Sequence, residues 1–176
     1  IINGSEGKTN YAMGIVSASV KGDEKIPAIT KKSYSNVSSV TFKAKFDNTV
    51  ATTDRWGLGI TETKDNYNCY ASTAELAMDN EWHTYSFTFT ESNVQIAKDG
   101  ASFGTNNNYN NAGTYYFYFQ LCPSGGLNNE GIALMVDDFT VTYGGGTVEK
   151  DDFTSGVDTT FDKANGQREL LQTEYT

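Results

Sequence analysis

Short runs of alternating hydrophobic and polar residues cover most of the chain, and Gly, Asn, Asp and Ser separate the runs. In residues 37–46, Val40, Phe42 and Ala44 fall on one side and the polar residues between them on the other. This period of two is that of a β-strand with one face in a core. Many such strands between turn residues predict a two-sheet sandwich or a barrel. The expected strands are residues 11–20, 37–46, 55–63, 67–73, 82–90, 114–122 and 131–144, with a hairpin at 94–103.

The expected strand at residues 114–122 (TYYFYFQLC) is unusual because neither of its faces is polar. A strand with one face in a core and one in water should be polar on the second face. The second row of side chains therefore needs a partner, which is either a ligand or another part of the protein. The two rows are Tyr115, Phe117, Phe119 and Leu121, and Tyr116, Tyr118, Gln120 and Cys122.

Two local signals refine the strand pattern. Asp99-Gly100 lies between two alternating runs and is a strong signal for a tight hairpin turn. The alternation of the last expected strand slips at Asp137-Asp138, which predicts a β-bulge there.

The second row of residues 114–122 suits a sugar ligand. Tyr116 and Tyr118 can cover the C–H face of a pyranose, and the amide of Gln120 can bond its hydroxyls. Gly57 and Gly59 would leave a flat floor for a chain-like ligand if their strand lies beside this one. The alternative is that both faces are covered by protein, one of them by the tail or a loop.

Other aromatic and amide side chains are candidates for the same carbohydrate contacts. Trp56 has the parity of core residues, whereas Trp82 has outward parity. Tyr70 shares a face with Asn68, which suits a ligand groove. Tyr109 lies in an Asn-rich loop, where its ring either anchors the loop or contacts a ligand. The full set of expected carbohydrate-binding residues is Tyr116, Tyr118, Gln120, Tyr70, Asn68, Trp56, Trp82, Tyr109, Asn128 and Asn129.

Composition and charge narrow the classes of partner that the chain is expected to bind. The 176 residues suit one domain, and the aromatic share of 13% favours strands over helices. The net charge of −9 and the lack of a basic stripe argue against a nucleic-acid partner. No run approaches 18 apolar residues, so we expect no membrane insertion. The Asn-, Ser-, Thr- and Gly-rich loops are typical of secreted or cell-surface bacterial proteins that degrade cell walls, and the lack of a signal peptide suits a mature or excised fragment.

Two segments resemble a known family. "WHTYSFTFTESNVQIAKDG" (82–100) and "YFYFQLCPSGGLNNEGIALMVDDFTVTYG" (116–144) resemble the laminin-G-like branch of the concanavalin A-like sandwiches, and many jelly-roll carbohydrate-binding modules end in a similar way. The resemblance covers roughly residues 11–144. It implies an all-β, two-sheet antiparallel β-sandwich with ligand on a concave face or at the loop rim.

The resemblance also predicts the domain organisation. Residues 1–146 would form a carbohydrate-binding β-sandwich, and GGG at 144–146 would be a hinge. Such domains usually open with a strand that this chain lacks at its start. We therefore expect residues 147–176 to supply it, by circular permutation within the chain or by strand donation between chains. The alternative is a disordered remnant of a following module.

Metal, disulfide and catalytic candidates are few. Asp137 and Asp138 could hold the structural calcium that this sandwich type often carries, or form a solvated pair. Cys69 and Cys122 permit one disulfide, which the alternation leaves open. His83, the only histidine, has inward parity and is expected to be packed or hydrogen-bonded.

We therefore expect a protein that is not an enzyme. Concanavalin A-like glycosidases place their carboxylates at alternating positions of one strand, whereas Glu75, Asp79 and Glu81 have the wrong spacing. The expected function is non-catalytic binding of a polysaccharide, a glucan or another plant or host glycan, within a larger multi-modular protein. The alternative is a structural or adhesive module whose aromatic face and tail bind protein.

Overall fold

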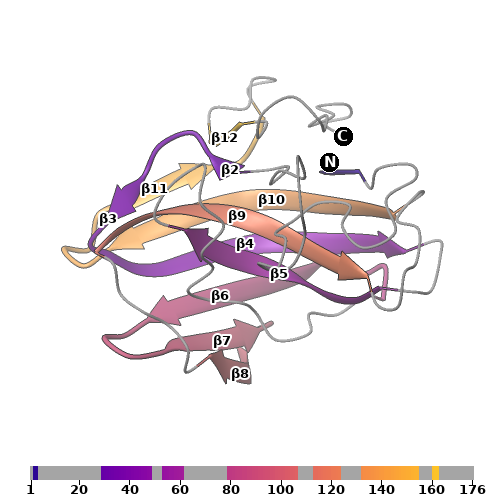
Figure 1. The fold of residues 1–176 in the computed structure, drawn as a ribbon, viewed down its shortest axis with the longest axis horizontal. Helices are drawn as coiled ribbons and strands as arrows, with labels where there is room; N and C mark the ends of the chain where they lie inside the picture. The colour runs from indigo at the N-terminus through magenta and orange to yellow at the C-terminus, as the bar shows by residue number, and fades with distance from the viewer. Residues whose placement is uncertain are drawn as a thin grey trace, which may run out of the picture.

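The computed structural model of the protein describes residues 2–3, 29–48, 53–61, 79–106, 113–123, 132–154 and 160–162. All regular elements in these segments are β-strands, and the strands form two antiparallel sheets (Figure 1). The predicted all-β, two-sheet antiparallel sandwich is therefore confirmed. No helix among the described residues is long and apolar enough to cross a membrane.

The larger sheet has seven strands and is built around the long pair of β4 and β10. These two strands pair from Ile132 opposite Asn48 to Tyr143 opposite Val37. The other edge of β10 carries two short strands, β1 and β11. In spatial order the strands are β1 (Ile2–Asn3), β10 (Ile132–Tyr143), β4 (Val37–Asn48), β6 (His83–Phe89), β7 (Val94–Lys98) and β8 (Ala101–Asn106), with β11 (Val148–Asp151) also on β10.

The smaller sheet has five strands, and β9 is its centre. β9 pairs with β5 along most of its length, which confirms that the strand containing Gly57 and Gly59 lies beside residues 114–122. Two-residue strands complete the sheet. Its members are β9 (Thr114–Pro123), β5 (Thr53–Thr61), β2 (Ile29–Thr30), β3 (Tyr34–Ser35) and β12 (Phe161–Asp162).

The core lies between the sheets and consists largely of aromatic rings. The ring of Phe42 on β4 meets Phe119 on β9 edge-on, with centroids 5.1 Å apart, and Phe139 meets Phe161 at 5.0 Å. Aromatic pairs favour such tilted and edge-on arrangements. Most of the described side chains with inward parity are buried, namely Val40, Phe42, Ala44, Leu58, Ile60, Tyr85, Phe87, Tyr115, Phe117, Phe119, Phe139 and Val141. Phe89, Val136 and Tyr143 have the same parity but are only partly buried, and they pack against this core.

Both local signals are confirmed. β7 and β8 form a hairpin whose two loop residues, Asp99 and Gly100, have φ angles of 51° and 80°, as a type I′ turn requires. The register of β10 against β4 shifts between Asp137 and Thr140, and Asp138 has a φ of 51°, so the predicted bulge is present.

Parts of the carboxy-terminal segment lie against the sandwich. β11 pairs with residues 139–142 of β10, and β12 pairs with β2. Phe161 is only 5% exposed and belongs to the core, and Phe153 packs against it. Whether residues 147–176 take the place of an amino-terminal strand stays a prediction.

Candidate functional site

The expected tyrosine platform on β9 is not open to solvent. Tyr118 is 0% exposed, and Tyr116 is half-buried. The expectation that both rings form an open stacking surface is therefore wrong for Tyr118. The side chain of Gln120 lies outside what the structure describes, and its backbone pairs with Gly57.

Gly59 shows why Tyr118 is covered. Gly59 and Tyr118 are directly opposite each other on β5 and β9. A Cβ atom placed on Gly59 would lie 1.9 Å from Cζ of Tyr118, so the phenol ring lies across the glycine. The glycine does provide a flat floor, as expected, but the ring of Tyr118 occupies it in place of a ligand.

Most of the other expected carbohydrate contacts cannot be placed. Tyr70, Asn68, Tyr109, Asn128 and Asn129 lie outside the described residues, as does Cys69 of the possible disulfide. Trp56 pairs with Leu121 through the backbone, and its side chain is not described.

Trp82 is the expected contact that the structure leaves accessible. Its side chain is 49% exposed, and only Val148 is a comparably exposed large hydrophobic residue in the described segments. Trp82 immediately precedes β6, between Glu81 and His83. An exposed indole at this position is available for stacking.

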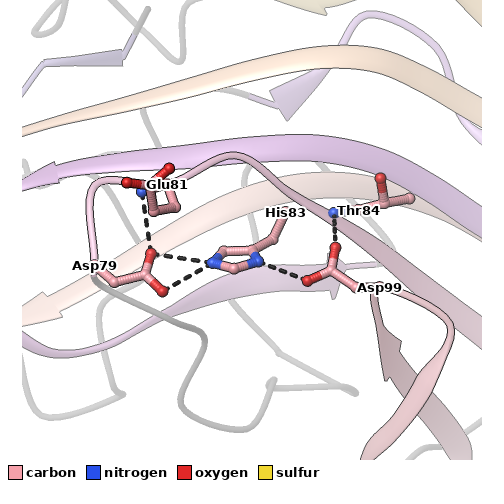
Figure 2. Close-up of polar contacts among 5 residues, drawn as sticks. All are labelled: Asp79, Glu81, His83, Thr84 and Asp99. Atoms are coloured by element: carbon pink, nitrogen blue, oxygen red, sulfur yellow. Dashed lines mark hydrogen bonds and ion pairs between the residues drawn. The ribbon is translucent and has the colours of Figure 1, made fainter.

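His83 lies next to Trp82 and is held between two carboxylates (Figure 2). Its Nδ1 is 2.7 Å from Oδ2 of Asp99, and its Nε2 is 3.0 and 2.9 Å from the two oxygens of Asp79. The imidazole is 14% exposed, whereas the side chains of Asp79 and Asp99 are 48% and 50% exposed. Each carboxylate therefore bonds the partly buried ring and still reaches solvent.

Local structure holds both carboxylates in place. Oδ1 of Asp79 also accepts the backbone N–H of Glu81 at 3.1 Å, which orders the turn before β6. Asp99 occupies the type I′ turn, and its Oδ1 accepts the N–H of Thr84 at 2.9 Å. The Asp99 N–H in turn donates to the carbonyl of Thr84 at 2.8 Å. The hairpin tip is thereby fastened to the start of β6 (Figure 2).

The geometry favours a protonated ring. A neutral imidazole donates from one nitrogen only, but both nitrogens of His83 face carboxylate oxygens. Burial alone would lower the pKa of His83, but the hydrogen bonds to Asp99 and Asp79 outweigh burial and raise the pKa above 6.5. The N–H of Thr84 and then His83 lower the pKa of Asp99. Burial tends to raise the pKa of Asp79, but hydrogen bonds from His83 and Glu81 lower it overall.

The expected calcium ligands have other partners. The two oxygens of Asp138 each lie 2.5 Å from a lysine ammonium, Lys43 on β4 and Lys150 on β11. Asp137 Oδ1 accepts the N–H of Asp138. Across the described segments, no group of three or more His, Cys, Asp and Glu side chains is placed to hold a metal ion. Calcium binding stays a prediction, and it would require Asp138 to exchange its lysines for the ion.

Sequence reasoning placed His83 correctly as a hydrogen-bonded residue but missed its two partners. The spacing of Asp79 from other carboxylates and the Asp99-Gly100 turn signal do not by themselves indicate contact with the histidine. The sequence does contain a signal for both partners. Asp79 lies four residues before His83, and the Asp99-Gly100 turn belongs to the next hairpin, whose tip lies beside the start of β6.

No protein-family model matches the chain, and no curated protein matches it. Similar solved structures include a glycoside hydrolase family 16 endo-glucanase from Bacteroides ovatus in complex with G4G3G-2F-DNP. It is 16% identical with a TM-score of 0.27, over 66% of this chain and 68% of that chain. A second is a GH16 protein of the Bacteroides ovatus mixed linkage glucan PUL in complex with a G4G4G3G product, 17% identical with a TM-score of 0.28 over the same shares. Likeness at this level identifies neither a substrate nor site residues.

One expectation is corrected by these matches. We expected a protein that is not an enzyme, but both similar structures are glycoside hydrolases. The expected absence of catalysis therefore does not stand. Cleavage becomes an outcome to be measured alongside binding.

Proposed function

We propose that the chain recognises a polysaccharide, a glucan or another plant or host glycan, at the Trp82 site. This site is the segment around the start of β6, with Trp82, Asp79 and Glu81, together with Asp99 of the next hairpin and with His83 between the two aspartates. The observation that carries the proposal is the half-exposed indole of Trp82, next in sequence to a histidine that is bonded to two ordered carboxylates.

Covering the exposed indole of Trp82 with a ligand would contribute a favourable burial free energy. A tryptophan side chain can bury about 150–250 Å². At 49% exposure, Trp82 leaves about 2–3 kcal/mol of burial free energy unused. The C–H face of a pyranose is apolar and flat enough to cover such a ring. Stacking on Trp82 would supply most of the affinity.

The carboxylates supply the polar contacts that such a ligand needs. Sugar hydroxyls are donors, and hydrogen bonds to ionised acceptors are stronger than those to neutral ones. Asp79 and Asp99 are about half exposed, and backbone N–H groups fix the orientation of both. The acceptors are therefore ordered before a ligand arrives, which lowers the entropic cost of binding.

Charge favours a neutral glycan. The chain carries a net charge of −9, and the Trp82 site itself adds three carboxylates against one histidine. A polysaccharide rich in uronic acids would be repelled. We expect uncharged glucans or xyloglucan to bind better than pectin or alginate.

Affinity electrophoresis against a polysaccharide panel tests this proposal. Trp82→Ala should abolish retardation by the ligand glycan, because losing about 2–3 kcal/mol weakens binding by roughly 30- to 150-fold. Trp82→Phe should retain part of it, and Tyr116→Ala, on the partly covered face of β9, is the matched control that should bind normally. Retardation of Trp82→Ala equal to that of wild type would exclude the site. Release of reducing sugar from the bound glycan would show whether binding is followed by cleavage.

The alternative of a protein interface retains one supporting observation. Val148, at the start of β11, is 55% exposed on an edge of the larger sheet. Size-exclusion chromatography over a range of concentrations separates the two functions. A concentration-dependent oligomer that binds none of the glycans would favour the protein interface.

A further inference from the structure

His83 connects two segments that the Trp82 site needs together. Asp79 belongs to the turn that carries Trp82, and Asp99 belongs to the tip of the β7–β8 hairpin. The imidazole bonds both, at 2.7 Å to Asp99 and at 2.9 Å to Asp79. With only 14% of its side chain exposed, His83 presents little surface to a ligand.

The two bonds depend on one proton. With both nitrogens protonated, each N–H donates to a carboxylate. When one proton leaves, the bare nitrogen presents a lone pair to carboxylate oxygens about 3 Å away, and an attraction becomes a repulsion. One of the two segments must then move or take in water.

We propose that His83 is a positioning residue whose imidazolium holds the Asp79 turn and the β7–β8 hairpin together, so that the Trp82 site loses order and glycan affinity when His83 is deprotonated. The part that concerns glycan rests on the proposed function. The part that concerns the order of the site does not.

The described groups around the ring support this direction. On its own strand and turn, Asp79 and Glu81 are acidic, and the ring of Tyr85 lies edge-on with its centroid 6.2 Å away. The hairpin adds Asp99 and, next to it, Lys98, whose charge acts on Asp99. On β4 the residue opposite His83 is Ala44. Carboxylates therefore dominate the charges near the ring, and they favour the imidazolium.

The expected pH range follows from the directions of the shifts. The clamp is the pair of bonds from the His83 imidazolium to Asp79 and Asp99. Because the pKa of His83 is raised above 6.5, the clamp is complete below pH 6.5 and is lost as pH rises through the pKa that His83 has in the folded protein. Because the pKa values of Asp79 and Asp99 are lowered from 3.8, their side of the clamp is lost only in stronger acid. Glycan affinity should be greatest in mildly acidic solution.

Thermodynamic linkage gives a reciprocal measurement. If deprotonation weakens glycan binding about threefold, saturating glycan must raise the pKa of His83 by about 0.5 unit. The chain has a single histidine, so its ring signals in a two-dimensional NMR spectrum can be followed without ambiguity.

The order of the site can be measured without any glycan. The chain has two tryptophans, and Trp56→Phe leaves Trp82 as the sole tryptophan, whose emission is excited selectively at wavelengths that the tyrosines do not absorb. Its emission should change with pH at the midpoint of the His83 titration. If Trp56→Phe does not fold, 5-fluorotryptophan in the otherwise unchanged chain gives a separate ¹⁹F signal for Trp82, assigned with Trp82→Phe.

Three variants distinguish positioning from a purely structural role. His83→Gln should remove the pH transition of Trp82. Asp79→Asn and Asp99→Asn keep a neutral acceptor for the N–H of Glu81 and of Thr84, and asparagine tolerates the positive φ of Asp99. Both should shift the midpoint to lower pH while the protein stays folded.

The outcomes separate the two proposals. Coincident midpoints for His83 and Trp82 support the clamp even if no glycan binds at any pH, in which case the proposed function fails alone. Trp82 signals that stay constant while His83 titrates would overturn the clamp. Glycan affinity that is constant across the His83 titration would also overturn it, while leaving the proposed function intact.

Discussion

Replacing Gly59 by alanine tests the contact that closes the expected tyrosine platform. A new Cβ would lie 1.9 Å from Cζ and 2.1 Å from both Cε2 and the hydroxyl oxygen of Tyr118. Carbon atoms settle at about 3.5–4.0 Å, so the ring would have to shift by about 1.6 Å or more. Tyr118 is 0% exposed, so the ring has to move against the groups that cover it or leave its buried position.

Two relaxations are available, and both are costly. If the ring of Tyr118 presses into its neighbours, overpacking costs about 1–3 kcal/mol. If the ring swings out to solvent, the lost burial costs about 1.5–3 kcal/mol. We therefore expect Gly59→Ala to lower the free energy of unfolding by about 1–3 kcal/mol. Equilibrium unfolding in guanidinium chloride measures this directly.

The sign should reverse when the ring is absent. Alanine is about 0.5–1 kcal/mol more favourable than glycine inside a strand. In a Tyr118→Ala background, Gly59→Ala should therefore stabilise the protein slightly, and the double-mutant cycle should give a clear coupling energy. Gly145→Ala is the matched control, because nothing lies within 4 Å of a Cβ there, and it should be neutral or stabilising. If Gly59→Ala unfolds within about 0.5 kcal/mol of wild type, the ring does not lie across the glycine, and the tyrosine platform must be reconsidered.

Two further substitutions test how the carboxy-terminal segment is attached. Phe161→Ala removes a 5% exposed ring that packs on Phe119 and Phe139, and it should cost about 3–5 kcal/mol by calorimetry or chemical denaturation; a cost below about 1 kcal/mol would show that β12 is not docked. Asp138→Asn removes the charge shared by Lys43 and Lys150, and it should cost about 1 kcal/mol or less at neutral pH. Because the two lysines lower the pKa of Asp138, this contribution is present above pH 3.8 and is lost as pH falls through the lowered pKa. It should also shrink in 1 M salt, and a cost that salt leaves unchanged would contradict an ionic origin.

Alternation along the chain predicted which side chains face the core but not what covers the opposite face. Phe117 and Phe119 are buried as expected, because strand parity alone assigns them to one side. Tyr118 has the opposite parity and is equally buried, with its ring across Gly59 and its backbone paired with Ile29. That pairing depends on β2, a two-residue strand too short to show alternation.

The contacts of His83 show the same limit, because alternation predicts the environment of a side chain but not its bonding partners. Parity predicted that the ring would be packed or hydrogen-bonded, and Asp99-Gly100 predicted the hairpin turn. Only the register of β6 against β7, with Tyr85 opposite Lys98, brings the turn to the histidine. Register depends on contacts between strands, so a single sequence does not determine it.

The register of β10 shows which path a strand would follow if residues 147–176 supplied the missing amino-terminal strand. β11 runs from Val148, opposite Thr142, to Asp151, opposite Phe139. Farther along the same edge, Ile2 lies opposite Leu134 and Asn3 opposite Ala133, so β1 continues in the same direction as β11. One strand passing from the tail into the first residues of the chain would follow this path.

The break between β11 and β1 falls beside residues 135–138 of β10, where the bulge lies and where Asp138 meets Lys150 of β11. Backbone N–H and C=O groups at a sheet edge need partners from a neighbouring strand or from water. Here two short segments from opposite ends of the sequence share that task. Loss of either β1 or β11 should therefore expose its part of the β10 edge to water.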